Sequence, residues 1–201
     1  MYFGYVKKVV KALLSIAASL FLLFRSIELM RQLAGSSPGD LNGWEQTFVG
    51  AFMAITVTGV VALPGFALPT SCLLPQRYFH IKKPQKLLYW YKILGVDFFR
   101  KLLLLAFWGQ QKNRKRYFDG TRSGFDNLIY QSKQSEFGHL LPLIALQIIA
   151  TFCFVKGFAI VALVITIINI IGNFYPIPLQ RMHRYRIARL RELHEKHSRI
   201  S

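Results

Sequence analysis

The chain has 201 residues, 53% of them hydrophobic, and a formal net charge of +17. An ordinary soluble domain is excluded, because the apolar and the basic residues occupy separate stretches. Basic proteins often bind nucleic acid, but no zinc-ligand spacing, helix-turn-helix or RNA-binding aromatic motif accompanies this charge. Cys72 and Cys153 define neither a disulfide framework nor a metal site. The composition predicts an all-α integral membrane protein, without nucleic acid or metal as partners.

Four apolar runs approach the length of a membrane-spanning helix, which needs about 20 residues to cross the hydrocarbon core. The runs cover about residues 9–30, 47–68, 138–156 and 157–175. Lys156 and Gly157 separate the last two runs, and this short connection predicts a tight hairpin of two antiparallel helices. We therefore expect about four transmembrane helices in a single membrane domain that covers residues 1–201.

The basic residues are distributed unevenly around these four runs. Most of the 26 Lys and Arg residues lie near the N-terminus, between residues 73 and 138, or in a basic tail at residues 181–201. Cytoplasmic loops of membrane proteins carry an excess of Lys and Arg. The distribution therefore predicts a multi-pass protein of the cell membrane with both termini in the cytoplasm. The oligomeric state does not follow from the sequence.

The segment between the second and third runs is both aromatic and basic. Residues 86–108 are too charged to span a membrane, and their pattern is typical of an amphipathic helix, or of two short ones broken at Gly95, at the membrane surface. Residues 109–124 form a basic stretch that suits anionic lipid headgroups or phosphate. A solvated loop that merely follows the membrane topology is the alternative for that stretch.

Glu136 and His139 stand at the start of the predicted hairpin. Residues three apart share a helix face. A carboxylate beside an imidazole is the minimum set for general-base catalysis, because the carboxylate holds the ring tautomer and the ring accepts a proton. A helix cap and an interfacial histidine are the alternative interpretation.

The hairpin closes with the sequence NFYPIPLQRMHRYR, which contains Asn173, Gln180, and three arginines. Arginine offers a planar fork to phosphate or carboxylate. A plain membrane anchor would explain the arginines but not Asn173 and Gln180. His139 and Asn173 lie almost equally far from the Lys156–Gly157 turn, so the hairpin brings them to a similar depth. We predict that Glu136, His139, Asn173 and Gln180 form one site.

These motifs resemble a known family. They are Lys133-x-x-Glu136-x-x-His139, the apolar hairpin, and Asn173-x-x-Pro176 followed by Gln180-Arg181-x-x-Arg184-x-Arg186. Together they resemble the glycosyl-diaponeurosporenoate acyltransferase family of staphyloxanthin-type carotenoid biosynthesis, over about residues 79–188. The resemblance implies transfer of a fatty acyl group to a hydroxyl of a glycosylated lipid or carotenoid-like acceptor. It implies no cofactor beyond an acyl donor such as acyl-CoA or acyl carrier protein.

The chemistry of the candidate residues suits the reaction that the resemblance implies. His139 would act as the catalytic base and Glu136 would orient it, while Asn173 or Gln180 would donate a hydrogen bond to a developing oxyanion. The substrate-binding residues would be Asn173, Gln180, Arg181, Arg184 and Arg186. The expected partners are membrane lipids, a hydrophobic lipid-like acceptor and the acyl donor.

Two other classes of function stay open. A non-enzymatic membrane scaffold or lipid-binding assembly protein would use the basic segments to hold a partner or anionic lipid. A small transporter or channel subunit would need polar side chains along its helix interiors. The hairpin offers few such side chains: Gln147, Thr151, Thr166 and Asn169.

Overall fold

The computed structural model describes residues 2–105 and 122–198. These residues form helices and their connections, and none of them lies in a strand. In the described part of the chain, four helical stretches are long and apolar enough to cross a membrane: Tyr5–Gly35, Gly43–Gly65, Gly124–Val155 and Ala159–Glu192. The prediction of an all-α membrane protein with about four transmembrane helices is confirmed.

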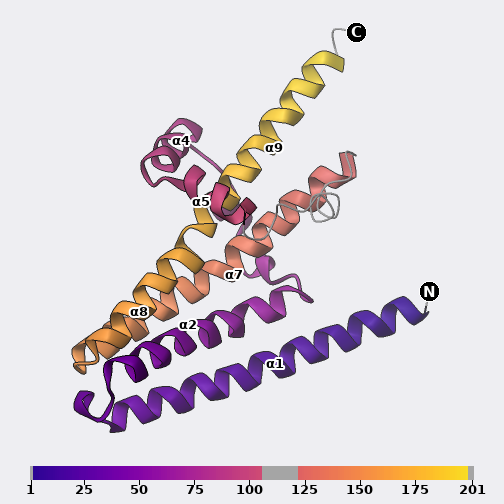
Figure 1. Ribbon diagram of the computed structural model, residues 1–201. Coiled ribbons are helices and arrows are strands. Elements are labelled where there is room, and N and C mark those ends of the chain that lie inside the picture. The colour runs from indigo at the N-terminus through magenta and orange to yellow at the C-terminus, as the bar shows by residue number, and fades with distance from the viewer. Residues whose placement is uncertain (1, 106–121, 199–201) are drawn as a thin grey trace. The chain divides into compact units, whose positions relative to one another are not determined.

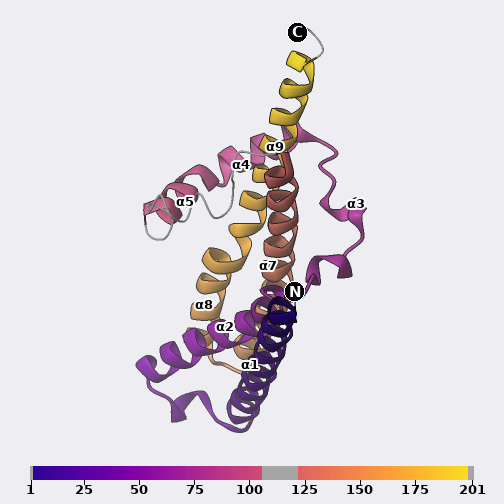
Figure 2. The same cartoon turned by 90° about the vertical axis from the view of Figure 1, so that its right-hand side faces the viewer.

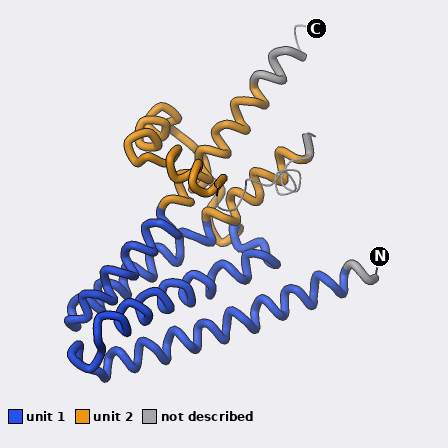
Figure 3. The backbone as a smooth tube through the Cα atoms, viewed as in Figure 1, with its two compact units in different colours: residues 1–71, 137–174 blue, residues 72–136, 175–201 orange. Residues whose placement is uncertain are grey.

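The chain divides into two compact units, shown in different colours in Figure 3. Unit 1 contains residues 1–71 and 137–174, and unit 2 contains residues 72–136 and 175–201. The long helix α7 (Arg122–Val155) contributes its first part to unit 2 and its second part to unit 1. The predicted span at 138–156 is therefore the apolar end of a longer helix, whose polar first part continues the same backbone hydrogen bonding.

Unit 1 consists of apolar helices (Figures 1 and 2). The helices are α1 (Tyr2–Gly35), α2 (Gly43–Gly65), the second part of α7 and α8 (Ala159–Asn169), followed by the short π-helix η4 (Ile170–Phe174). α2 runs antiparallel to α1, and α8 runs antiparallel to the second part of α7 and parallel to α2. A short 3₁₀ turn, η1 (Pro38–Asp40), precedes α2. α2 contacts both α1 and α8.

The core of unit 1 is apolar and closely packed. Met53 of α2, Leu146 of α7 and Ile165 of α8 are completely buried in it. Gly50 lets α2 approach α8, because a Cβ atom at that position would lie 3.0 Å from both the Val161 carbonyl oxygen and the Val164 Cβ. Small residues at such crossings are typical of membrane helices.

The predicted hairpin between α7 and α8 turns at Gly157. Its φ of 89° is a left-handed conformation that glycine adopts without steric cost. The backbone N–H of Phe158 donates to the Cys153 carbonyl at 2.9 Å and thereby closes the end of α7. The connection is short enough to bring α8 back along α7, and the Asn169 side chain donates to the Leu143 carbonyl of α7 at 2.9 Å.

Unit 2 contains shorter helices around α9 (Pro176–Ser198). They are α3 (Gln76–Phe79), α4 (Pro84–Ile93), α5 (Val96–Leu103) and the first part of α7; the 3₁₀ turn η2 (Thr70–Leu73) lies at the boundary of the units. Of the two alternatives that the sequence offered, one helix or two short ones broken at Gly95, the structure has two, since this residue separates α4 from α5 with a φ of 63°. Tyr91, Val96, Leu179 and Met182 form the core in which α4 and α5 pack against α9.

Candidate active site

Glu136 is the centre of a charged cluster in unit 2. Its side chain is fully buried, and each of its carboxylate oxygens accepts a hydrogen bond from an arginine of α9. Arg181 Nε donates to Oε1 at 2.7 Å, and Arg184 Nη2 donates to Oε2. Burial of one ion is unfavourable by several kcal/mol unless partners compensate for the lost water. The two arginines provide that compensation.

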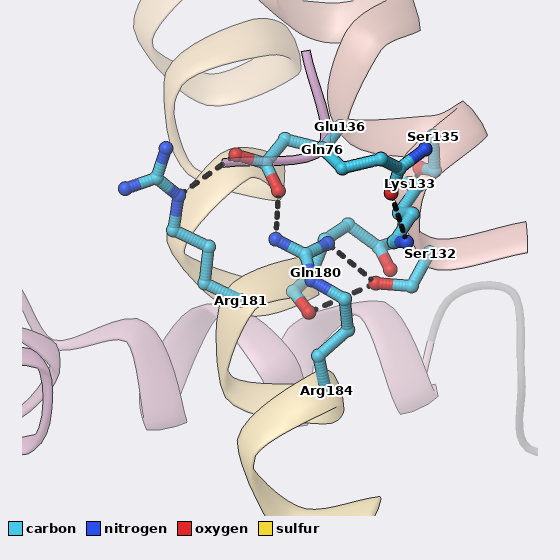
Figure 4. A network of polar contacts seen from close by, with 8 residues as sticks. All are labelled: Gln76, Ser132, Lys133, Ser135, Glu136, Gln180, Arg181 and Arg184. Carbon is cyan, nitrogen blue, oxygen red and sulfur yellow. Dashed lines mark hydrogen bonds and ion pairs between the residues drawn. The ribbon is translucent and has the colours of Figure 1, made fainter. Parts of the chain in front are cut away.

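A set of serine and amide contacts surrounds this ion pair (Figure 4). Arg184 Nη1 donates to Ser132 Oγ at 3.0 Å, and Ser132 Oγ donates to the Gln180 carbonyl at 2.9 Å. The Gln180 side chain donates to Ser135 Oγ at 3.1 Å. Ser132, Ser135 and Glu136 all belong to α7, so the same helix supplies the acceptors for three polar groups of α9.

The aromatic residues of α3 cover the cationic side chains of the cluster. The Arg181 guanidinium lies 5.0 Å from the ring centre of Tyr78, and the Arg184 guanidinium lies 5.5 Å from that of Phe79. Such cation–π contacts favour a charged guanidinium in a partly dry site. Burial raises the pKa of the Tyr78 phenol, and the negative charge of Glu136 raises it further, so Tyr78 is uncharged at neutral pH.

The charged cluster contains more cations than anions. Arg181 and Arg184 share the single carboxylate of Glu136. Lys133, which lies on α7 like Glu136, donates a hydrogen bond to the uncharged Gln76 side chain at 2.7 Å. Arg184 Nε is buried without a hydrogen-bond partner among the described residues. The side chain of Arg181 is 34% exposed. The cluster is therefore suited to binding an anionic group.

A second, uncharged group of polar residues lies in unit 1 around Asn173. The Asn173 amide nitrogen donates to Asn169 Oδ1 at 3.0 Å and to Thr58 Oγ1 at 3.2 Å. The Asn173 Oδ1 atom lies 3.3 Å from His139 Nδ1. Asn169 and Asn173 are both buried. We call these four residues the amide network; it joins α2, α7, α8 and η4.

The amide network determines the tautomer of His139. Because the Asn169 nitrogen donates to the Leu143 carbonyl, the Asn169 oxygen is left to accept from Asn173. Both amide hydrogens of Asn173 are then used, and its oxygen faces the histidine ring. His139 must therefore carry its proton on Nδ1, which leaves the lone pair of Nε2 available as a base.

The π-helix η4 positions the residues next to His139. Pro176 has no N–H group, so the carbonyl of Gly172 cannot form the usual α-helical bond to it. That carbonyl faces the His139 ring as a hydrogen-bond acceptor. Irregular π-helical turns in membrane helices often mark functional sites.

The structure thus pairs His139 with Asn173, and Glu136 with Arg181 and Arg184. That Glu136, His139, Asn173 and Gln180 form a single site stays a prediction. Asn173 has both of its amide hydrogens in use, so a role as oxyanion donor would require one of these bonds to break.

Arg186 has other partners. Its Nη2 atom lies 3.9 Å from Oδ1 of Asp97 in α5, and its guanidinium lies 5.8 Å from the ring centre of Tyr91. Asp97 also accepts a hydrogen bond from the Tyr91 hydroxyl at 3.2 Å. Burial raises the pKa of the Tyr91 phenol, and the negative charge of Asp97 raises it further. Arg186 therefore contributes to the packing of α5 and α4 against α9.

Sequence reasoning missed Thr58, Ser132, Ser135 and Tyr78. The sequence gives a weak indication for Ser132, because it lies one helical turn before Glu136 and so shares its helix face. For Thr58 the sequence gives no indication beyond a hydroxyl side chain in an apolar run.

The predicted phosphate-binding residues of the basic stretch 109–124, including Lys112, Arg114, Lys115 and Arg116, lie outside the described residues. Within the described residues, no group of three or more His, Cys, Asp and Glu side chains could hold a metal ion.

The fold and these contacts define a class: a helical membrane protein that combines a histidine with an available base nitrogen and a cationic cluster suited to an anion. The chain matches the family of glycosyl-4,4'-diaponeurosporenoate acyltransferases over residues 75–193. It belongs to this family, and the resemblance expected over residues 79–188 is confirmed. Its class of activity is therefore acyl transfer. Comparison with curated proteins and with solved structures gave no match.

Proposed function

We propose that the protein transfers a fatty acyl group to a hydroxyl of a glycosylated lipid or carotenoid-like acceptor within the membrane. Membership of the acyltransferase family supports the type of reaction. The observation that carries the proposal is the hydrogen bond between His139 and Asn173, because it leaves one ring nitrogen free to accept a proton. The apolar helices around the amide network suit a lipid-soluble acceptor.

The proposed reaction is a direct transfer. The acceptor hydroxyl oxygen forms a bond to the acyl carbonyl carbon, while its proton passes to His139 Nε2. The bond between the acyl carbon and the sulfur or oxygen of the donor then breaks, and the protonated ring returns the proton to that leaving group. A positioned base of this kind typically contributes 10²–10⁴-fold to a rate.

Asn173 and Glu136 have different roles in this proposal. Asn173 performs the task that the sequence suggested for Glu136, because it fixes the tautomer of His139 and stabilises the charged ring. Glu136 fixes the positions of Arg181 and Arg184, whose surplus positive charge suits a phosphate of the acyl donor. Gln180 is proposed as a further substrate-binding residue.

We also propose a location in the cell membrane with both termini in the cytoplasm, and with α4 and α5 at the membrane surface. The distribution of Lys and Arg supports this orientation. Single cysteines at Lys92 and Lys156, introduced after replacement of Cys72 and Cys153, would test it. A membrane-impermeant thiol reagent added to intact cells should label position 156 and not position 92, and the opposite pattern would overturn the orientation.

The direct test of the proposed function is a comparison of lipid extracts from cells with and without the gene. Mass spectrometry should find glycosylated lipids that gain the mass of a fatty acyl group, less water, only when the protein is present. If no such species appears although the protein is made and inserted, the proposal is wrong. A non-enzymatic role in holding anionic lipids would then explain the cationic cluster better.

A further inference from the structure

Unit 2 contains a cleft of about 330 Å³ next to the charged cluster. Basic and aromatic side chains line it, chiefly Tyr78, Lys82, Lys83, Lys86, Trp90 and Arg181. None of its lining residues, all of which belong to the described part of the chain, is acidic. The cleft lies outside the predicted phosphate-binding stretch, and its three lysines have no role in the proposed transfer of the proton.

The charge in this cleft is unbalanced. Lys82, Lys83 and Lys86 are exposed, and none of them takes part in an ion pair among the described residues. Arg181 gives only its Nε to Glu136, and in Figure 4 its two terminal nitrogens point away from that carboxylate. Four cations around one cavity repel each other, and an anion between them would remove the repulsion.

The start of helix α4 adds to this positive potential. Lys83 is the N-cap residue of α4, and its side chain makes no capping hydrogen bond; the first turn contains no acidic residue. By contrast, α2 begins with Asn42 and Glu45, whose side chains both accept backbone hydrogen bonds. The N-terminus of a helix carries partial positive charge, so lysines at that end are unfavourable unless an anion is present.

The aromatic side of the cleft suits the remainder of a larger ligand. Trp90 is 48% exposed although it lines the cavity. The ring of Tyr78 already covers the guanidinium of Arg181. Lysine ammonium groups bind phosphate as point charges, while aromatic faces accept a planar base or an alkyl segment.

We propose that this cleft binds the phosphate-bearing end of the acyl donor. The identification of the ligand as the acyl donor rests on the proposed function, but binding of phosphate in the cleft can be tested without acyl transfer. Two sources share this chemistry: the phosphorylated nucleotide end of a coenzyme A thioester, and the headgroup of an anionic phospholipid. In both cases the phosphate lies among Lys82, Lys83, Lys86 and Arg181, at the start of α4.

The first arm of the test measures binding of coenzyme A to the full-length protein in nanodiscs of phosphatidylcholine, by calorimetry. The double variant Lys83→Gln/Lys86→Gln should raise the Kd about 25-fold, at roughly fivefold for each charge removed. The matched variant Lys92→Gln/Lys101→Gln loses the same charge from the same unit but outside the cleft, and its Kd should change less than about threefold.

The second arm tests the lipid source with mixed nanodiscs of phosphatidylglycerol and phosphatidylcholine. The lipid that remains bound after extraction into detergent is identified by mass spectrometry. If the wild-type protein does not bind coenzyme A but retains phosphatidylglycerol, and only the cleft variant loses it, the phosphate belongs to a phospholipid. Equal losses in the cleft and control variants, or binding of neither probe, would overturn the cleft as a phosphate site.

These measurements also separate this inference from the proposed function. Neither arm contains an acceptor, so a protein that performs no acyl transfer can still bind the probe. His139→Ala, which removes the proposed base, should bind coenzyme A or phosphatidylglycerol as the wild type does. Loss of probe binding in His139→Ala would contradict the assignment of the phosphate to the cleft.

Discussion

The two units hold polar groups of different kinds. In unit 1 the amide network is uncharged, and its members satisfy each other between apolar helices. In unit 2 the buried carboxylate of Glu136 forms ion pairs with Arg181 and Arg184. A charged side chain in an apolar membrane helix is energetically unfavourable, so uncharged hydrogen-bond partners suit unit 1. In unit 2, arginines are present to pair with a buried carboxylate.

This difference determines what each group can do. The amide network fixes hydrogen-bond directions, because each amide has one donor side and one acceptor side, and it thereby fixes the tautomer of His139. The charged cluster instead holds an excess of positive charge in one place. That charge does not depend on where a particular proton is bound. Under the proposed function, proton transfer therefore belongs to unit 1 and anion binding to unit 2.

The largest expected loss of stability comes from removing the charge of Glu136. Glu136→Gln leaves Arg181 and Arg184 without their counter-ion, and loss of one partner of a buried ion pair typically costs about 3–5 kcal/mol. The free energy of unfolding in detergent, measured by denaturant titration, would show this decrease. Asp126→Asn is the matched control, because Asp126 also pairs with an arginine of α9 but is 72% exposed.

The control should lose less than about 1 kcal/mol, as exposed ion pairs do. Similar losses in Glu136→Gln and Asp126→Asn would show that the charged cluster is no more than a surface ion pair. The claim that unit 2 is stabilised by a buried ion pair would then be wrong.

A substitution of Asn173 tests the other side of the comparison. Asn173→Leu keeps the volume but removes the acceptor that holds Nδ1–H of His139, so we expect acyl transfer to slow about 10- to 100-fold, as for other partners that orient a functional histidine. Thr166→Val is the control, since the Thr166 hydroxyl donates only to the Ala162 carbonyl of its own helix. An Asn173→Leu protein as active as this control would remove the amide network from the mechanism.

A smaller effect is expected at Thr58. Thr58→Val leaves one amide hydrogen of Asn173 buried without an acceptor, which costs about 1–3 kcal/mol. Thr58→Ser keeps the hydroxyl and should retain most of the stability. Thermal unfolding of both variants would check this order, and equal stability of the two would mean that the Thr58 contact does not stabilise unit 1.

The smallest effect concerns Tyr78 and pH. Because its pKa is raised in the folded protein, the unfolded chain loses the phenol proton first. The contribution of Tyr78 to stability is thus present below about pH 10, the ordinary pKa of tyrosine, and is lost as the pH rises through the raised pKa. Between pH 9 and 11, Tyr78→Phe should lose less stability than the wild type. The exposed Tyr89→Phe should follow the wild type, and identical profiles for all three proteins would contradict the prediction.

The sequence predicted the fold class well, because long apolar runs have few alternatives to spanning helices. It also predicted the turn at Lys156–Gly157 and, as one of two alternatives, the break at Gly95, both of which depend on local signals. It placed His139 and Asn173 at a similar depth, but it named Glu136, and not Asn173, as the residue that orients the ring. It did not predict that Glu136 binds Arg181 and Arg184, since their separation of more than 40 residues leaves no periodic signal. Thr58 escaped for the same reason: its partner is 115 residues away.

The rate of acyl transfer by His139→Ala tests the central claim most directly. Membranes with equal amounts of folded wild type, His139→Ala and Thr166→Val are supplied with acyl donor and glycosylated acceptor, and product is measured by mass spectrometry. We expect a decrease of about 10²–10⁴-fold for His139→Ala alone, because only this variant lacks the base. A His139→Ala protein that forms the acylated product at the rate of the Thr166→Val control would contradict the assignment of His139 as the catalytic base.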